Sequence, residues 1–125
     1  MIIGIGTDIV EIDRLKKAIE NRPKMVERVF TRIEIDYSEA IGNIYTSLAA
    51  RFAAKEAVAK ALGTGFRNFK WQDIEVYNDN LGKPGINIYG KALEKAQELG
   101  VARIFVSLSH CRDYAVATVV LEGEK

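Results

Sequence analysis

The chain has 125 residues, a length typical of one folded domain, so we expect a single domain over residues 1–125. Its hydrophobic fraction of 48% and charged fraction of 28% are those of a globular protein, and no apolar stretch approaches the roughly 20 residues of a membrane-spanning helix, which excludes that class. The net charge of +1 hides an uneven distribution, because basic residues gather between Arg14 and Arg32.

The N-terminal segment MIIGIG is apolar and runs straight into charged residues. It has neither a basic leader nor a small-residue cleavage site, so we predict a buried strand of a cytoplasmic protein. Cys111 is the only cysteine and cannot form an internal disulfide, which fits a reducing compartment. His110 lies next to it, but neighbouring residues of a strand point to opposite faces, so a thiolate nucleophile activated by His110 is not expected.

The chain is predicted to begin with a short strand and a helix. Residues 2–6 are apolar and close at a glycine, which favours a strand. Thr7 or Asp8 then caps a helix that begins near Ile9, because such side chains accept bonds from the first N–H groups of a helix. Pro23 ends this helix.

Three further helical segments are predicted in the first half of the chain. A short turn covers residues 26–30, and Thr31 with Glu34 makes a capping-box pattern that begins the next helix. Residues 45–62 are rich in alanine and predict the longest helix, which stops at the glycines of residues 63–65. So many alanines indicate close packing against a sheet or another helix.

The second half of the chain changes to strands. A hairpin around the turn-rich stretch NDNLGKPG joins two of them, and one helix separates this hairpin from the last two strands. The predicted ranges are 74–76 and 86–89 for the hairpin, 91–99 for the helix, and 104–108 and 114–121 for the last strands. This order predicts an α+β domain with helices packed on a largely antiparallel sheet.

Two carboxylates stand in recognisable frames: Asp8 in GIGTDIVEIDR and Glu56 in RFAAKEAVAKALGTG. Taken alone, an Asp after a strand caps a helix, and Glu56 with Lys60 four residues on makes a solvated ion pair. Together they have a second interpretation, because Mg²⁺ keeps several waters and is held by one or two carboxylates plus substrate phosphates. Lys60 would then neutralise the phosphate or protonate its leaving oxygen. Arg51 and Lys55 share another face of the same helix.

Five sequence blocks extend the pattern over nearly the whole chain: GIGTDIVEIDR, FTRIE, RFAAKEAVAKALGTG, LGKPGI and VSLSHCRDYAVATVVLE. In this order they resemble the holo-acyl-carrier-protein synthases, the small bacterial type of 4′-phosphopantetheinyl transferase. The resemblance implies transfer of the 4′-phosphopantetheine arm of coenzyme A to a serine of an apo acyl carrier protein used in fatty-acid synthesis, with release of adenosine 3′,5′-bisphosphate. It also implies the fold of that superfamily, Mg²⁺ or Mn²⁺ as cofactor, and a closed trimer with active sites between subunits.

The resemblance assigns roles to single residues. It implies that Asp8 and Glu56 are metal ligands, that Lys60 lies at the diphosphate, and that these three form the catalytic set. His110 is expected to reach the 3′-phosphate or the adenine across a subunit boundary. The full set of implied coenzyme A contacts is Arg51, Lys60, Gly63, Thr64, Gly65, Lys83, Pro84, Ser109 and His110, with Asn80 and Gly82 beside the adenine.

Transfer of a phosphoryl-linked group requires positioning of the reactants and stabilisation of charge on the phosphate, and it requires no covalent nucleophile of the enzyme. The small residues of the LGTG segment are expected to offer free N–H groups to phosphate oxygens. A base must take the serine proton, and we prefer a water on the metal, with Glu56 and His110 as alternatives.

The basic helical segment has three interpretations: a solvated face, a nucleic-acid footprint and a docking surface for an acidic protein. It lacks the interleaved aromatic residues that stack on bases, so no nucleic-acid partner is expected. Acyl carrier proteins are acidic, and in the resembled family this helix docks them. The predicted contact residues are Arg14, Lys17, Arg22, Lys24, Met25 and Arg28, although Asn21 stands where some relatives have a basic residue.

Two rival functions fit the sequence less well. A non-catalytic α+β module that binds acidic proteins or nucleotides would not need Asp8, Glu56 and Lys60 together. Transferases for carriers of secondary metabolism generally have a duplicated chain, and no internal repeat is found here. The preferred carrier, the acceptance of acyl-coenzyme A and the metal used in the cell stay open.

Overall fold

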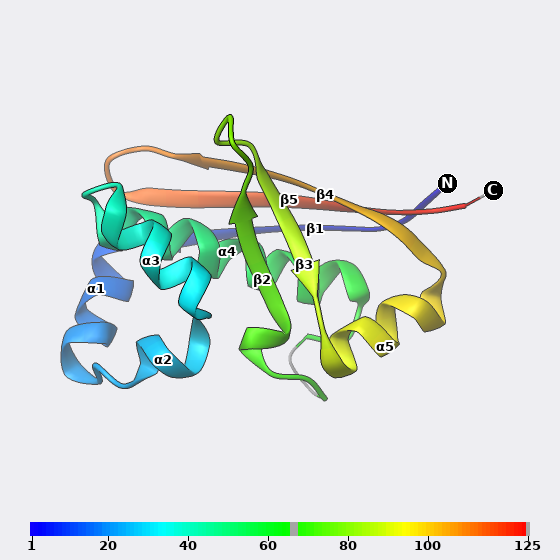
Figure 1. Ribbon diagram of the computed structural model, residues 1–125, viewed down its shortest axis with the longest axis horizontal. Coiled ribbons are helices and arrows are strands. Elements are labelled where there is room, and N and C mark those ends of the chain that lie inside the picture. Colours follow the sequence, from blue (N-terminus) through cyan, green and yellow to red (C-terminus); the bar gives the residue numbers. More distant parts are fainter. Residues whose placement is uncertain (66–67, 125) are drawn as a thin grey trace.

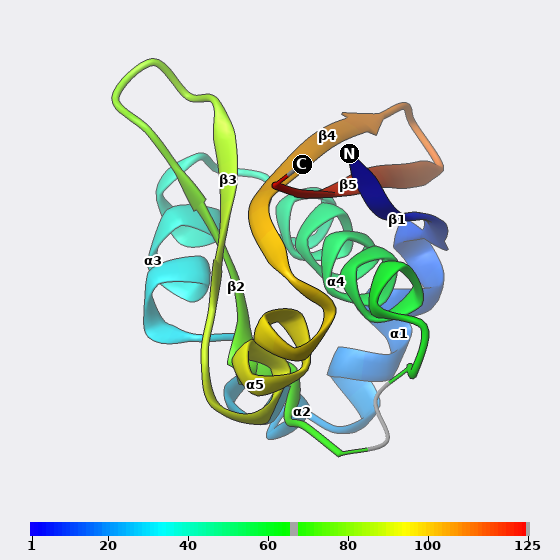
Figure 2. The same ribbon diagram turned by 90° about the vertical axis from the view of Figure 1, so that its right-hand side faces the viewer.

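The computed structural model describes residues 1–65 and 68–124. Its long helix α4 lies at the centre, between a three-stranded sheet on one side and the smaller helices and a hairpin on the other (Figure 1, Figure 2). The elements are β1 (Ile2–Glu11), α1 (Ile12–Asn21), α2 (Met25–Val29), α3 (Arg32–Ala40), α4 (Ile44–Leu62), the 3₁₀ turn η1 (Trp71–Asp73), β2 (Ile74–Asn78), β3 (Pro84–Ile88), α5 (Gly90–Leu99), β4 (Val101–His110) and β5 (Tyr114–Gly123).

Both sheets are antiparallel, which confirms the predicted α+β class. The larger sheet has the strand order β1-β5-β4, and the hairpin β2-β3 forms the second sheet. Alternate residues of β5, from Ala115 to Gly123, are buried. They pack with the alanines of α4, so that the helix is covered on most sides. Within the described residues, no helix is long and apolar enough to cross a bilayer.

Two glycines of β1 allow α4 to lie directly on the sheet. A Cβ atom at Gly6 would collide with the carbonyl oxygen of Ala57, and one at Gly4 with that of Ala61. Neither glycine has a positive φ, so the reason for glycine here is the close approach of the helix backbone. The GIG segment therefore sets how α4 crosses β1.

Replacing Gly6 by Ala should destabilise the protein by about 1–3 kcal/mol, because the new methyl group meets backbone that cannot move aside as a side chain can. Thermal and urea unfolding would measure this loss. Ser107→Ala, at an exposed position of β4, is the control and should change stability by less than about 0.5 kcal/mol. Equal stability of Gly6→Ala and the wild type would contradict the close-approach argument.

The opposite face of the larger sheet is not covered by any described element. Ile5 and Ile9 of β1 and Phe105 of β4 are exposed on it. Ile5 and Phe105 both pair with Val120 of the central strand, so they form one row across the sheet. Strands β1 and β4 are also the two edges of this sheet. An apolar face with two long edges is unusual for a monomer.

The prediction for the N-terminal strand was wrong in its length. The strand does not close at Gly6 but continues to Glu11, and α1 begins at Ile12. Asp8 pairs with Ala117 inside the strand, so neither Thr7 nor Asp8 caps a helix. Pairing with β5 satisfies the backbone groups of this segment, and such long-range pairing overrides local capping preferences.

The other predicted elements are confirmed, with ends that differ by a few residues. Thr31 and Glu34 form the predicted capping box at the start of α3. Gly63 and Gly100 end α4 and α5 in the left-handed conformation. The short turn η1 was not predicted.

Candidate active site

Asp8 and Lys60 meet where α4 crosses β1. The Lys60 Nζ atom lies 3.0 Å from Asp8 Oδ1 and also donates to the carbonyl oxygen of Thr7 at 3.1 Å. Asp8 lies on the same face of β1 as Gly6, because strand residues alternate between faces. The close crossing at Gly6 thus brings a helix lysine to a strand carboxylate that is 52 residues away in sequence.

Glu56 lies one helical turn before Lys60 and is partly buried. Burial raises the pKa of the Glu56 carboxyl, the negative charge of Asp8 raises this pKa further, and Lys60 lowers it. Asp8 and Glu56 are therefore close enough to repel each other. A carboxylate pair of this kind is relieved by a cation, and two carboxylates suit Mg²⁺, which takes its other oxygen ligands from water and substrate. In the described part of the chain, no cluster of three or more metal-binding side chains competes with this pair.

Asp8 and Glu56 line a cleft of about 570 Å³ between β1, α1 and α4. Arg14 is the basic residue of its wall, and Met25 also faces it. The rest of the lining is mostly apolar and consists of Ile9, Val10, Glu11, Leu15, Ala18, Phe52 and Tyr114. The cleft thus joins the carboxylate pair to the basic end of the molecule.

A second pocket, of about 290 Å³, lies on the β4 side of α4 and contains Arg51, Pro84 and His110. Arg51 is only 3% exposed. Its guanidinium lies 4.3 Å from the centre of the Tyr37 ring and donates to the side-chain oxygen of Asn78. Its Nε atom has no hydrogen-bond partner among the described residues. A buried cation with an unused donor at a pocket wall is suited to binding an anion.

The two pockets lie on different sides of α4. Arg51 and Glu56 are five positions apart, which places them about 140° from each other around the helix axis. Arg51 and Lys55 share one face as predicted, and both point away from the carboxylate pair. The structure therefore gathers the predicted site residues into two groups and does not unite these groups within one chain.

The remaining predicted coenzyme A contacts are spread around these pockets. Thr64 lines a third cavity, of about 360 Å³, with residues of α5. Lys83 lines a fourth beside Tyr77 and Phe105. Ser109 is exposed on β4. Asn80 is exposed in the turn of the β2-β3 hairpin, and Gly82 lines the Arg51 pocket.

The N–H groups of Gly63 and Gly65 are not free, contrary to the prediction. They donate to the carbonyl oxygens of Lys60 and Ala59, at 3.0 and 3.3 Å. Both glycines have a positive φ, as expected where a helix is closed by bonds back to its last turn. Closing the helix is thus the role that these N–H groups have in the structure.

The predicted docking residues gather at one end of the molecule, on α1, α2 and the segment between them (Figure 1). Of these residues, Arg14 and Met25 line the cleft. Lys17 is exposed and forms an ion pair with Asp13 at 3.0 Å. Arg14 and Met25 thus connect the predicted docking surface to the cleft of the carboxylate pair.

Sequence reasoning missed several residues of the site. Tyr37 and Asn78 contact Arg51. Phe52 lines the cleft, and the centre of its ring lies 4.9 Å from that of Trp71. Glu34 appeared only as a capping residue, although its carboxylate is fully buried against Lys55. The spacing of Glu34 and Tyr37, three positions apart on one helix, was the one available signal that both face α4.

Comparison with known proteins identifies the family. Residues 4–119 match the sequence profile of the 4′-phosphopantetheinyl transferase superfamily. The holo-[acyl-carrier-protein] synthase of Clostridium tetani is 55% identical over 124 residues, which cover 99% of this chain and 98% of that protein. The corresponding protein of Clostridium novyi is 50% identical over 98% of this chain and 88% of its own length.

Solved structures show the same fold. The holo-[acyl-carrier-protein] synthase of Neisseria meningitidis is 41% identical, with a TM-score of 0.88 and coverage of 98% of this chain and 99% of that one. The enzyme of Bacillus anthracis str. Ames, in complex with CoA (3′,5′-ADP), is 37% identical, with a TM-score of 0.82 and coverage of 99% of both chains.

The chain therefore belongs to the 4′-phosphopantetheinyl transferase superfamily and, within it, to the holo-[acyl-carrier-protein] synthases. The predicted family, fold class and enzyme class are confirmed.

Proposed function

We propose that this enzyme transfers the 4′-phosphopantetheine arm of coenzyme A to a serine of apo acyl carrier protein in the cleft between β1, α1 and α4. The observation that carries the assignment is the meeting of Asp8, Glu56 and Lys60 beside a cleft that Arg14 also lines. The similarity to an enzyme solved with CoA (3′,5′-ADP) supports coenzyme A as the donor.

Asp8 and Glu56 are the groups that would hold Mg²⁺ or Mn²⁺. When bound, the metal supplies neutralisation of charge on the diphosphate. Lys60 is oriented by two contacts, to Asp8 and to the carbonyl oxygen of Thr7, so its ammonium group is kept at the same end of the cleft. There it would neutralise the phosphate or donate a proton to the leaving oxygen.

Glu56 and His110, the two side chains that could accept the proton of the carrier serine, lie in different pockets. Glu56 lines the cleft, whereas His110 lies in the Arg51 pocket on the other side of α4. Of these two side chains, Glu56 is the one that lies in the cleft with Asp8. Its raised pKa makes it a stronger base than an exposed carboxylate, although a Glu56 that holds a metal is not free to take the proton.

An acidic carrier protein would dock on the basic end of the molecule, with Arg14 nearest to the carboxylate pair. Replacing Arg14 by Glu should raise the KM for the carrier about tenfold or more and leave the KM for coenzyme A nearly unchanged, because like charges then meet at the docking surface. Steady-state kinetics at several salt concentrations would measure both constants, and the effect should shrink as salt screens it.

Arg103→Glu is the matched control for Arg14→Glu. Arg103 is an exposed arginine near the far end of the sheet, where it contacts Glu122 at 3.6 Å. Reversing the charge of Arg103 should therefore leave the KM for the carrier and the KM for coenzyme A unchanged. If Arg14→Glu raised both KM values equally, or if neither responded to salt, α1 would not be the docking surface.

We also propose that the enzyme works as a trimer. The apolar face of the sheet and its two edge strands supply a surface that association would cover. The separation of the two pockets by α4 supports sites shared between neighbours, since one subunit would offer the carboxylate pair and the next would offer Arg51 and His110. A cytoplasmic location and a role in fatty-acid synthesis stay predictions.

A mass measurement tests the activity itself. The purified protein is incubated with coenzyme A, Mg²⁺ and an apo carrier, and the carrier should gain the mass of the phosphopantetheine arm. A non-catalytic module would bind the carrier or the nucleotide without changing this mass.

A further inference from the structure

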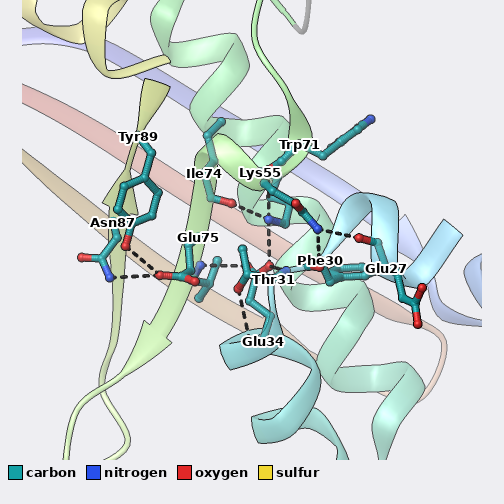
Figure 3. Close-up of polar contacts among 12 residues, drawn as sticks. Glu27, Phe30, Thr31, Glu34, Lys55, Trp71, Ile74, Glu75, Asn87 and Tyr89 are labelled. Atoms are coloured by element: carbon teal, nitrogen blue, oxygen red, sulfur yellow. Dashed lines mark hydrogen bonds and ion pairs between the residues drawn. The ribbon is translucent and has the colours of Figure 1, made fainter. Parts of the chain in front are cut away.

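A buried ion pair lies on the face of α4 that carries Arg51. Lys55 and Glu34 are both fully buried, and Lys55 Nζ lies 2.8 Å from Glu34 Oε1 (Figure 3). Lys55 Nζ also donates to the carbonyl oxygens of Trp71, at 3.1 Å, and Ile74. All three N–H donors of the ammonium group therefore have acceptors within the protein.

Glu34 joins three elements of the fold. Its Oε1 atom accepts from the Thr31 N–H at 2.8 Å and contacts Lys55 of α4. Its Oε2 atom accepts from the Val76 N–H of β2, also at 2.8 Å. One carboxylate thus ties the start of α3, the middle of α4 and the centre of β2 together.

This pair is not explained by stability alone. Taking two charges out of water is costly, and replacing a buried ion pair by apolar residues is often neutral or stabilising. Nor does the pair touch the reacting groups, because neither residue lines the cleft that holds Asp8 and Glu56. A role in placing β2 accounts for the contacts that it makes.

Strand β2 leads from this pair directly to the Arg51 pocket. Asn78 lies two positions after Val76, and its side-chain oxygen accepts from the Arg51 guanidinium. The amide nitrogen of Asn78 donates to the carbonyl oxygen of Gly82 at 3.0 Å, so Asn78 also shapes the hairpin turn before Pro84. Strand β2 is thus attached to α4 at three points: directly from Lys55 to Ile74, through Glu34 to Val76, and from Arg51 to Asn78. A shift of β2 would move Asn78, Gly82 and Pro84 within the pocket.

We propose that Glu34 is a positioning residue for the nucleotide pocket, whose carboxylate holds β2 against α4 so that Asn78 keeps Arg51 and the hairpin turn in place. This inference rests on the proposed function, which makes the Arg51 pocket a binding site for the nucleotide of coenzyme A. Glu34 itself touches no substrate.

Replacing Glu34 by Gln tests the proposal. Gln keeps the shape of the side chain but has one acceptor oxygen where Glu has two. In one orientation its NH₂ group faces the Val76 N–H, and in the other it faces the Thr31 N–H and Lys55. The affinity for adenosine 3′,5′-bisphosphate, measured by calorimetry, should fall about tenfold, since a buried N–H without its acceptor costs free energy of that order. The KM for coenzyme A should rise with it, and the KM for the carrier should stay within about twofold of the wild type. Glu39→Gln, at an exposed position of the same helix, is the control and should change none of these values.

A second variant separates positioning from folding. Glu34→Gln with Lys55→Met removes both charges, so it should recover part of any stability that Glu34→Gln loses by leaving Lys55 unpaired. It restores neither the second acceptor oxygen of Glu34 nor the bond from Lys55 to Ile74 of β2, so the weak nucleotide binding should persist. Recovery of nucleotide affinity together with stability would overturn the positioning role, as would wild-type affinity in Glu34→Gln. A wild-type protein that neither binds the nucleotide nor modifies the carrier would instead refute the proposed function.

Discussion

Replacing Asp8 by Ala should lower the rate of arm transfer by about 10²- to 10³-fold or more, the scale expected when one preorganised charged group is removed from an active site. Asp8 is one of the two carboxylates proposed to hold the metal, and it also orients Lys60. Rates would be followed by carrier mass at saturating and limiting Mg²⁺. Asp36→Ala, at an exposed aspartate of α3, is the control and should keep wild-type activity. An Asp8→Ala variant with near wild-type turnover at limiting Mg²⁺ would refute the metal site.

Glu56→Gln should lose activity in the same way but gain stability in the absence of metal. The pKa of Glu56 is raised in the folded protein, so the folded state binds the proton more tightly than the unfolded state does. The contribution of Glu56 to the stability of the metal-free protein therefore becomes more favourable as the pH falls toward this raised pKa, and its charged carboxylate is unfavourable at neutral pH. Thermal unfolding in EDTA should give a higher Tm for Glu56→Gln at neutral pH, with the difference shrinking in acid. A lower Tm for Glu56→Gln would mean that Glu56 serves the fold rather than the site.

Local signals were sufficient to predict most of the helices and turns. The capping box of Thr31 and Glu34 and the stops at Gly63 and Gly100 depend on a few neighbouring residues, and each is confirmed. The length of β1 depends instead on β5, whose residues lie more than 100 positions away along the chain, as in the bond from the Thr7 hydroxyl to the Ala117 carbonyl oxygen. No local pattern reports such pairing.

The candidate site was predictable in its residues but not in its geometry. Asp8, Glu56 and Lys60 were identified from the sequence motifs around them. Their spacing alone suggests a surface ion pair between Glu56 and Lys60, but Lys60 contacts Asp8 instead. That contact exists because Gly6 lets α4 cross β1 closely. The burial of Lys55 was also not predicted, because charged residues are almost never fully buried unless they are paired, and its partner Glu34 lies on another helix.

Because α4 separates the carboxylate pair from Arg51 and His110, a site completed by a neighbouring subunit should be recoverable by mixing variants. Glu56→Ala and His110→Ala proteins, each weak alone, should regain activity when they are unfolded and refolded together. In trimers formed from equal amounts, a fully wild-type site arises where a His110→Ala subunit supplies the carboxylates and a Glu56→Ala neighbour supplies His110, which occurs at about one site in four. Activity should therefore return to roughly a quarter of the wild-type value.

The matched control for this experiment mixes two variants from the same side of α4. Glu56→Ala and Asp8→Ala both damage the carboxylate pair, which one subunit supplies whole, so every mixed site lacks one carboxylate and no activity should return. Light scattering would report the assembly, and subunit exchange would be verified with a mass-labelled chain. A fully active monomer, or no recovery with Glu56→Ala and His110→Ala despite verified exchange, would mean that each chain forms its site alone. In that case coenzyme A would have to reach from the carboxylate pair to Arg51 around α4 within a single subunit.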